Sequence, residues 1–198
     1  MNATSALQLA DWRRRVGELY DEVRTLGEES GWQVWREGKQ RLYSEHPQSP
    51  VPLDLRDGFV FRGYDYEPSL RVLAELIPSE PRHIDGDDEV PGMTHVGTLH
   101  STVDGAHQEL GAYWLDGYAG GLFVPFADAT SGSETYGGGR YVLDTAKGAD
   151  LGAVDDRIVL DFNLAYAPSC AHDPQWRCPL APAANRLRIA VRAGERSD

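Results

Sequence analysis

The sequence predicts an α+β domain in which N-terminal helices pack on an antiparallel β-barrel or β-sandwich. Up to about residue 45, apolar residues recur every three or four positions, and from residue 51 onward they tend to alternate with a period of two. Short strand-like runs then follow one another with turn residues between them, which is typical of α+β folds rather than alternating βαβ units. We therefore expect a single domain over residues 1–198, with a helical segment at 1–45 and a β-rich core at 51–198.

The first helix is predicted over residues 5–26, because its apolar side chains form one stripe. Ser5 with Gln8 fits a capping box at its start, and Gly27 is a typical stop signal. A second, shorter helix is predicted over residues 32–43, and the prolines that follow it end it. The side chains expected to face inward are Leu9, Trp12, Val16, Leu19, Tyr20, Val23 and Leu26 in the first helix, and Trp32, Trp35 and Leu42 in the second.

The remaining elements are predicted as strands separated by turn signals. Asp104-Gly105 is the clearest hairpin signal, since a type I′ turn requires positive φ at both central positions. Residues 78–92 are acidic and contain prolines, so we predict a loop there. The predicted strands cover residues 58–62, 70–77, 93–103, 106–115, 121–126, 140–144, 157–162 and 187–192.

The predicted hairpin places two histidines and a carboxylate on one face of the sheet. With a two-residue turn, Thr102 pairs with His107, and His100 sits opposite Glu109. Two imidazoles and a carboxylate suit metal binding or acid–base chemistry. We nevertheless interpret this face as the solvated one, because the opposite face shows the core pattern Leu99, Val103, Ala106 and Leu110.

Composition and charge exclude several classes of function. The net charge of −12 and the isoelectric point near 4.9 disfavour binding to nucleic acids and to anionic membranes. The N-terminus has no signal-peptide pattern, and no run of eighteen apolar residues occurs. Two cysteines do not make a disulfide framework. We expect a cytoplasmic protein with a small polar molecule as its partner, and no motif identifies a cofactor.

Residues 126–185 carry the polar residues that most resemble a site. The first block, 128–140, contains Asp128, Thr130 and Tyr136 and ends with three glycines before Arg140. Backbone N–H groups of the glycines and the guanidinium are suited to an anion. The structural alternative is a turn in which Asp128 and Thr130 bond to their own loop, with Arg140 in a buried ion pair with Asp128, Glu134 or Asp161.

Two further blocks follow this one along the chain. Asp161 and Asn163 come after an apolar run and, two residues apart in a strand, point to one face. A buried Asp161 needs a donor, and Arg140 is the expected partner. Inside a barrel these side chains would be desolvated and functional, whereas outside they would be ordinary surface. Asn185 completes the polar set.

Cys170, His172 and Cys178 resemble half of a zinc site. Their spacing departs from the usual paired ligands, and no second half is evident. A disulfide across these eight residues would not persist in a reducing cytosol. We favour two buried thiols that pack a proline-rich loop, with a metal site or a reactive thiol as the weaker alternatives.

Several blocks of the C-terminal half resemble a bacterial family known only as a domain of unknown function, number 1684 in that series. The matching blocks are FADATSGSETYGGGRY at 126–141, LDFNLAY at 160–166, PSCA at 168–171, CPLAP at 178–182, NRL at 185–187 and AGE at 193–195, together with Trp12-Arg13. The chain is similar in length to a shorter branch of that family, common in actinobacteria. The resemblance implies kinship but no reaction, and it implies that the shared polar signature includes the blocks described above.

Three functions are consistent with these patterns. In the leading hypothesis the domain binds a small polar or anionic molecule, with Thr130, Arg140, Asn163 and Asn185 as ligand-binding residues. The same pocket would suit hydrolytic or isomerising chemistry, with Asp128 or Asp161 as the base and Tyr136 as the acid. The second hypothesis is a non-catalytic scaffold whose polar motifs are structural. The third is a thiol or metal protein that uses Cys170 and Cys178.

Overall fold

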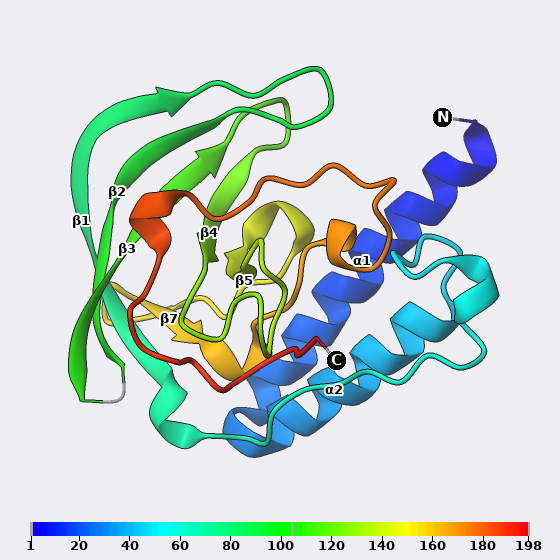
Figure 1. Cartoon of the computed structure of the whole chain (residues 1–198), viewed down its shortest axis with the longest axis horizontal. Helices are drawn as coiled ribbons and strands as arrows, with labels where there is room; N and C mark the ends of the chain where they lie inside the picture. The colour runs from blue at the N-terminus through cyan, green and yellow to red at the C-terminus, as the bar shows by residue number, and fades with distance from the viewer. Residues whose placement is uncertain (1, 104, 198) are drawn as a thin grey trace.

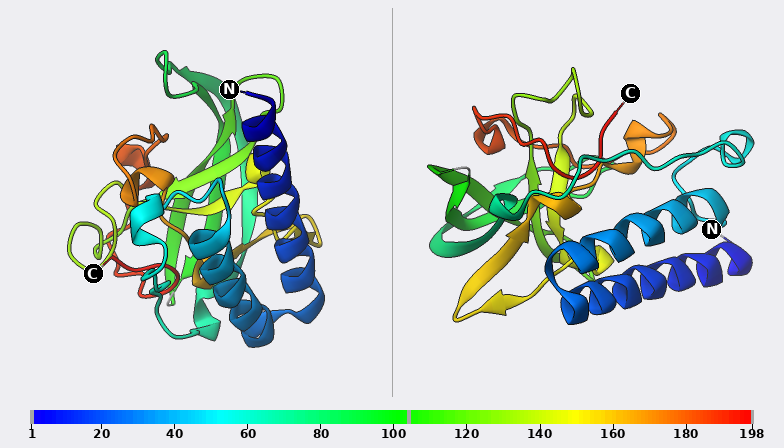
Figure 2. Two further views of the ribbon diagram at one scale, coloured as in Figure 1. Left: turned by 90° about the vertical axis from the view of Figure 1, so that its right-hand side faces the viewer. Right: turned by 90° about the horizontal axis from the view of Figure 1, so that it is seen from below.

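The computed structural model describes residues 2–103 and 105–197 as two antiparallel helices packed against a curled, seven-stranded antiparallel sheet (Figures 1 and 2). The α+β class is confirmed, and the sheet is a half-barrel with the strand order β5-β4-β3-β2-β1-β7-β6. No helix among the described residues is long and apolar enough to cross a membrane. The strands are β1 (Arg71–Ile84), β2 (Met93–Val103), β3 (Ala106–Leu115), β4 (Gly121–Phe126), β5 (Arg140–Asp144), β6 (Ala153–Val154) and β7 (Arg157–Asp161).

The two helices, α1 (Ala3–Leu26) and α2 (Glu28–Glu45), are longer than predicted and are joined by a single residue. The Asn2 side chain, rather than the predicted Ser5 and Gln8 pair, caps α1 by accepting the Ser5 N–H at 2.8 Å. Gly27 ends α1 as predicted, with φ of +66°, and α2 begins at the next residue.

Small residues let the helices approach each other closely. A Cβ added to Gly38 would lie 2.6 Å from a methyl carbon of Leu19, and one added to Gly31 would lie 2.9 Å from the Val23 carbonyl oxygen. This contact uses one side of α2, so its other side, with Trp35 and Tyr43, is free to pack toward the sheet.

The predicted β2–β3 hairpin is confirmed in its bounds and its register. Val103 pairs with Ala106, and His100 pairs with Glu109, as the alternation predicted. Gly105 has φ of +72°, which fits the turn, while Asp104 lies outside the described residues. The two strands pair along most of their length, so side chains on each face have fixed neighbours.

The prediction of a loop over residues 78–92 is wrong for its first part. β1 continues to Ile84 because a bulge between Pro78 and Arg82 lets the strand resume pairing with β2. The predicted strands at 58–62 and 187–192 do not form. In the first, the Phe61 N–H bonds to the Gln40 side chain at 2.7 Å instead of to a neighbouring strand.

Two hydrophobic clusters build the interior. One lies between the helices and the sheet and includes Trp35, Phe123 and Tyr141. The other joins the strands to the C-terminal segment and includes Phe126 and Val191. In the right-hand view of Figure 2 the helices lie at the lower right, and the C-terminal segment, in red, lies above them.

Candidate functional site

A cavity of about 430 Å³ lies between the two helices and the sheet. This volume is in the range of small-molecule pockets. Its walls come from both helices, from β3, β4 and β5, and from the loops before the C-terminus. Most of the lining is apolar or aromatic, with Trp12, Leu42, Leu115 and Phe123 among the wall residues.

Lys39 is the exceptional residue of this cavity. It lies on the buried side of α2 and only 8% of it is exposed. Its Nζ donates a hydrogen bond to the Tyr43 hydroxyl oxygen at 2.6 Å, and it lies 4.3 and 4.2 Å from the ring centroids of Tyr43 and Tyr166. No carboxylate of the described residues forms an ion pair with it. Lys39 is therefore a buried cation held only by a hydroxyl group and aromatic faces.

Burial lowers the pKa of Lys39 to about 8, because the charged ammonium loses its hydration. The negative charge of Glu195 opposes this shift from a distance, and the positive charge of Lys147 adds to it. Near neutral pH the side chain thus carries a proton that it holds far less tightly than an exposed lysine does.

Glu195, the carboxylate whose charge acts on the pKa of Lys39, is bonded to other groups. Its Oε2 accepts the Ala167 N–H at 3.0 Å, and its Oε1 lies 3.0 Å from His172 Nε2. Burial alone would raise its pKa, but the hydrogen bond and charge of His172, together with the charge of Lys39, hold the pKa of Glu195 below its usual value. The carboxylate fixes the loop at Ala167 and does not neutralise Lys39 by contact.

Tyrosines and one aspartate supply the other polar groups of the cavity. The Tyr166 hydroxyl donates to Asp144 Oδ2 at 3.0 Å, and Lys147 Nζ lies 3.5 Å from the same oxygen. The Tyr141 hydroxyl donates to the Pro179 carbonyl at 2.6 Å. Burial raises the pKa values of Tyr141 and Tyr166, so both remain hydrogen-bond donors.

The charges around the cavity are unbalanced. Among the described residues that line it there are four cations and one carboxylate, Asp144. The cations are Arg13, Lys39, Lys147 and Arg177, of which Arg177 also pairs with Glu89 at 2.7 Å. Lys147 likewise pairs with Asp144 at 3.5 Å, so among the described residues Arg13 and Lys39 are the lining cations without an ion pair, in a chain with a net charge of −12.

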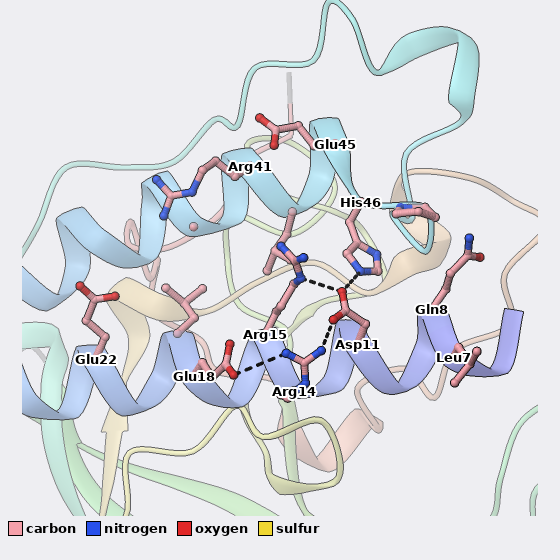
Figure 3. A pocket seen from close by; sticks show the side chains of 14 residues that line it. Leu7, Gln8, Asp11, Arg14, Arg15, Glu18, Glu22, Arg41, Glu45 and His46 are labelled. Atoms are coloured by element: carbon pink, nitrogen blue, oxygen red, sulfur yellow. Dashed lines mark hydrogen bonds and ion pairs between the residues drawn. The ribbon is translucent and has the colours of Figure 1, made fainter. Parts of the chain in front are cut away.

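A wider hollow of about 830 Å³ follows the outer groove between α1 and α2 (Figure 3). The charged groups around Asp11 pair with one another on the helix surface. Asp11 accepts hydrogen bonds from Arg15 at 2.7 Å and from Arg14, and it lies 3.1 Å from His46 Nε2. Exposed helical pairs of this kind are ordinary surface features. We therefore do not assign the site to this groove.

The residues predicted as a site form three separate clusters rather than one. In the first, Asp128 accepts hydrogen bonds from the Thr130 hydroxyl at 2.8 Å and the Val191 N–H at 2.6 Å, and Arg140 Nη2 lies 3.5 Å away. The guanidinium of Arg140 also donates to the backbone carbonyls of Val191 and Ala193. These bonds attach the C-terminal segment to β5.

The second cluster joins β7 to the loop before β1. Asp161 pairs with Arg71 at 3.2 Å, not with the expected Arg140. Burial raises the pKa of Asp161, although Asn163 and Arg71 act in the opposite direction. The Asn163 side chain accepts the Glu67 N–H at 2.8 Å and donates to the Glu67 carbonyl at 2.9 Å.

The third cluster is centred on Asn185, which is fully buried. Its amide nitrogen donates to the carbonyls of Gly111 and Pro125 at 2.9 and 2.7 Å, and its oxygen accepts the Gly111 N–H at 2.8 Å. The Asn185 side chain makes the hydrogen bonds to backbone groups of β3 and β4 that a neighbouring strand would otherwise make. None of the residues in these three clusters lines the cavity that contains Lys39. Their predicted roles in catalysis and binding stay predictions.

The cysteine block lies at the rim of the cavity. Tyr136 and Cys170 approach within 3.6 Å between the hydroxyl and the sulfur, and Cys178 lines the cavity. Both thiols are free. His172 instead contacts Glu195, and it stacks edge-on against Tyr43. Among the described residues, the side chains whose ligand atoms lie close enough together to hold a metal ion do not include Cys170, His172 or Cys178.

Sequence reasoning missed Lys39, although a signal was present. Lys39 lies four residues after Trp35 and four before Tyr43, so it occupies the apolar stripe of α2. A single charge within such a stripe indicates a buried or functional lysine, because long basic side chains are rarely fully buried.

Comparisons with known proteins identify relatives but no activity. The family model described as "Protein of unknown function (DUF1684)" matches residues 60–196. A solution NMR structure of an uncharacterized protein from Haloarcula marismortui is similar, with 41% sequence identity and a TM-score of 0.63 over 86% of this chain and 94% of that one. No curated protein matches the chain. The chain belongs to the DUF1684 family of proteins of unknown function.

Proposed function

We propose that this protein binds a small anionic molecule with an apolar body in the cavity between the helices and the sheet. The observation that carries the proposal is Lys39, a buried ammonium without an ion-pair partner among the described carboxylates. Burying an unpaired cation is costly, and groups whose pKa values are shifted by burial cluster at functional sites. An anion in the cavity would restore the interactions that Lys39 loses on leaving water.

The shape of the ligand follows from the walls. Aromatic and aliphatic side chains line the interior, so the ligand body is apolar, and Trp12 and Phe123 offer flat surfaces for it. Arg13, an exposed residue that lines the cavity, adds positive charge to it. A hydrophobic carboxylic acid fits this arrangement, with its carboxylate toward Lys39 and Tyr43.

In this proposal the polar signature of the family supports the cavity from outside. Arg140, Asn163 and Asn185 fix the loops that border the sheet, in line with the scaffold role considered from the sequence. The matched family region begins at residue 60, so Lys39 precedes it. We also infer a cytoplasmic location, which the two free thiols support.

Titration with the fluorescent apolar sulfonate anilinonaphthalene sulfonate, followed by displacement with decanoate, tests the proposal. We expect decanoate to displace the probe and the uncharged alcohol decanol to do so much less effectively. Lys39→Met should weaken decanoate binding by about 10- to 100-fold, because a hydrogen bond to a charged group contributes about 1.5–3 kcal/mol.

Arg41→Met is the matched control, since it removes a cation from the exposed side of the same helix. It should bind as the unaltered chain does. Equal displacement by decanoate and decanol, or undiminished decanoate binding by Lys39→Met, would show that Lys39 does not recognise an anion. Complete failure of the probe to bind would favour the scaffold hypothesis.

A further inference from the structure

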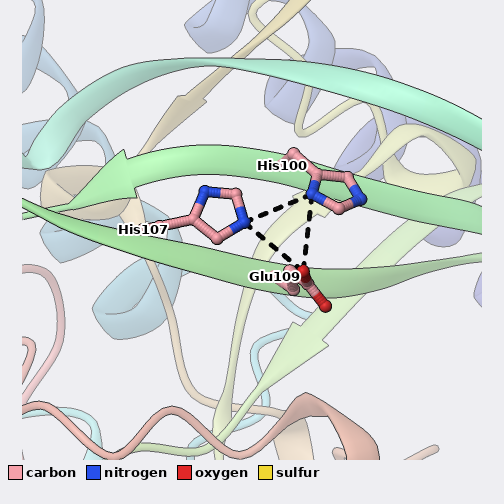
Figure 4. Close-up of side chains that lie close together, drawn as sticks. All are labelled: His100, His107 and Glu109. Carbon is pink, nitrogen blue, oxygen red and sulfur yellow. Dashed lines mark hydrogen bonds and ion pairs between the residues drawn. The ribbon is translucent and has the colours of Figure 1, made fainter.

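The outer face of the β2–β3 hairpin carries a second cluster, formed by His100, His107 and Glu109 (Figure 4). His100 Nδ1 lies 3.3 Å from His107 Nε2, and Glu109 Oε1 lies 3.6 Å from the first nitrogen and 3.3 Å from the second. In the part of the chain that the structure describes, this is the group of histidine, cysteine and acidic side chains whose ligand atoms all lie within 4.8 Å of one another.

These three separations match the edge of a metal coordination tetrahedron. With metal–ligand bonds of about 2.0–2.2 Å, neighbouring ligand atoms in a tetrahedral zinc site lie about 3.3–3.6 Å apart. We propose that His100, His107 and Glu109 bind a divalent transition-metal ion such as Zn²⁺. Two histidines, one carboxylate and an open fourth position are a recurrent zinc ligand set. The side chains are 31%, 62% and 58% exposed, so an ion reaches them from solvent.

The cluster is difficult to explain by protons alone. Each neutral imidazole presents one donor and one acceptor nitrogen, and a carboxylate is only an acceptor. If each imidazole donates its N–H to Glu109 Oε1, the two N–H groups lie 3.3 Å apart with no acceptor between them, whereas a metal ion accepts a lone pair from all three ligand atoms at once. The metal therefore accounts for the convergence of His100, His107 and Glu109 on one point.

The sheet holds the ligands in place before an ion binds. His100 pairs with Glu109 across the hairpin, and Thr102 pairs with His107, within a ladder that runs without interruption from Thr98 to Val103. Ligands on adjacent paired strands need only side-chain rotation to close on an ion, which reduces the cost of binding. Glu75, opposite His100 on β1, adds a carboxylate to the same face.

This site is independent of the cavity that contains Lys39. Neither histidine nor Glu109 lines that cavity, and alternate residues on β2, such as Leu99, point into the core. The sequence-based interpretation of this face as solvated is compatible with the exposure of the three side chains. The distances between the three ligand atoms add metal binding to that interpretation.

Calorimetric titration of the chelator-treated full chain with Zn²⁺ tests the site. We expect one ion per chain, and intense visible absorption when Co²⁺ replaces Zn²⁺, as tetrahedral coordination produces. Residues that merely orient ligands contribute about 10- to 100-fold to metal affinity, so His100→Ala and His107→Ala should each weaken binding by about 100-fold or more.

His95→Ala is the control, since it removes a histidine from the same strand without touching the cluster. It should leave Zn²⁺ affinity unchanged. Circular dichroism should show that all variants remain folded, because none of the substituted side chains is fully buried. Absence of binding, retention of binding by a His100→Ala/His107→Ala variant, or loss of binding in Cys170→Ser/Cys178→Ser would overturn the assignment.

Discussion

Replacing Lys39 by methionine should stabilise the protein at neutral pH in the absence of ligand. Methionine keeps a similar length and apolar stem but removes the charge that is buried beside Tyr43 and Tyr166. The pKa of Lys39 falls from 10.5 to about 8 on folding. The difference corresponds to a free-energy cost of about 3 kcal/mol while the lysine is protonated in both states.

The pH dependence follows from which state binds more protons. Between about pH 8 and pH 10.5 the unfolded chain keeps the Lys39 proton while the folded chain releases it, so stability rises with pH across this window. The free-energy cost of burying the charged Lys39 is fully present below about pH 8 and has largely disappeared near pH 10.5. The advantage of Lys39→Met should therefore shrink by about 2 kcal/mol between about pH 7 and pH 9.5.

Urea unfolding followed by tryptophan fluorescence measures both quantities. Stopping at about pH 9.5 keeps most tyrosines of the unfolded chain protonated, which isolates the lysine. Arg41→Met serves as the control and should show a difference from the unaltered chain that is small and nearly independent of pH, because Arg41 is exposed and arginine does not titrate there. An advantage of Lys39→Met that stays constant from pH 7 to pH 9.5 would refute the depressed pKa.

Two further predictions concern the polar blocks. Arg140→Ala should lower the free energy of unfolding by about 3–5 kcal/mol, because it leaves Asp128 and the Val191 carbonyl without the buried guanidinium. Urea unfolding measures this loss, and a loss below about 1 kcal/mol would contradict a structural role for Arg140. Cys178 should react slowly with a chromogenic disulfide reagent at neutral pH, because burial raises its pKa and only the thiolate attacks. The rate should rise through the alkaline range, and fast reaction at neutral pH in a Cys170→Ser background would contradict this expectation.

Local patterns predicted the elements whose partners are near in sequence. The β2–β3 hairpin was predicted with its register because turn chemistry and alternation act on adjacent residues. Gly27 was predicted as the end of α1 for the same reason. In contrast, the extension of β1 past Pro78 depends on pairing with β2 across a bulge, and proline content argued against it.

The sites were predicted less well, because convergence in space is a long-range property. Buried polar residues give the same sequence pattern whether their side chains contact a ligand or a backbone carbonyl far away in the sequence. Arg140 was expected to pair with Asp128, Glu134 or Asp161; it pairs with Asp128, and its guanidinium also reaches the carbonyl of Val191, 51 residues along the chain. The partner of Asp161 is Arg71, 90 residues away. Lys39 was overlooked because α2 was predicted from its apolar residues alone. The single charged residue within that apolar stripe was the more informative one.

The hydrogen bonds from Arg140 to the backbone of residues 191–195 also affect how the protein folds during synthesis. Residues 191–195 are synthesised after Arg140, and until they emerge from the ribosome Arg140 and Asp128 lack the backbone partners that they have in the folded protein. The β5 edge of the sheet therefore stays uncovered in a nascent chain that ends before residue 191. We expect folding at this edge to depend on a later docking step in which the Arg140 guanidinium binds the carbonyls of Val191 and Ala193.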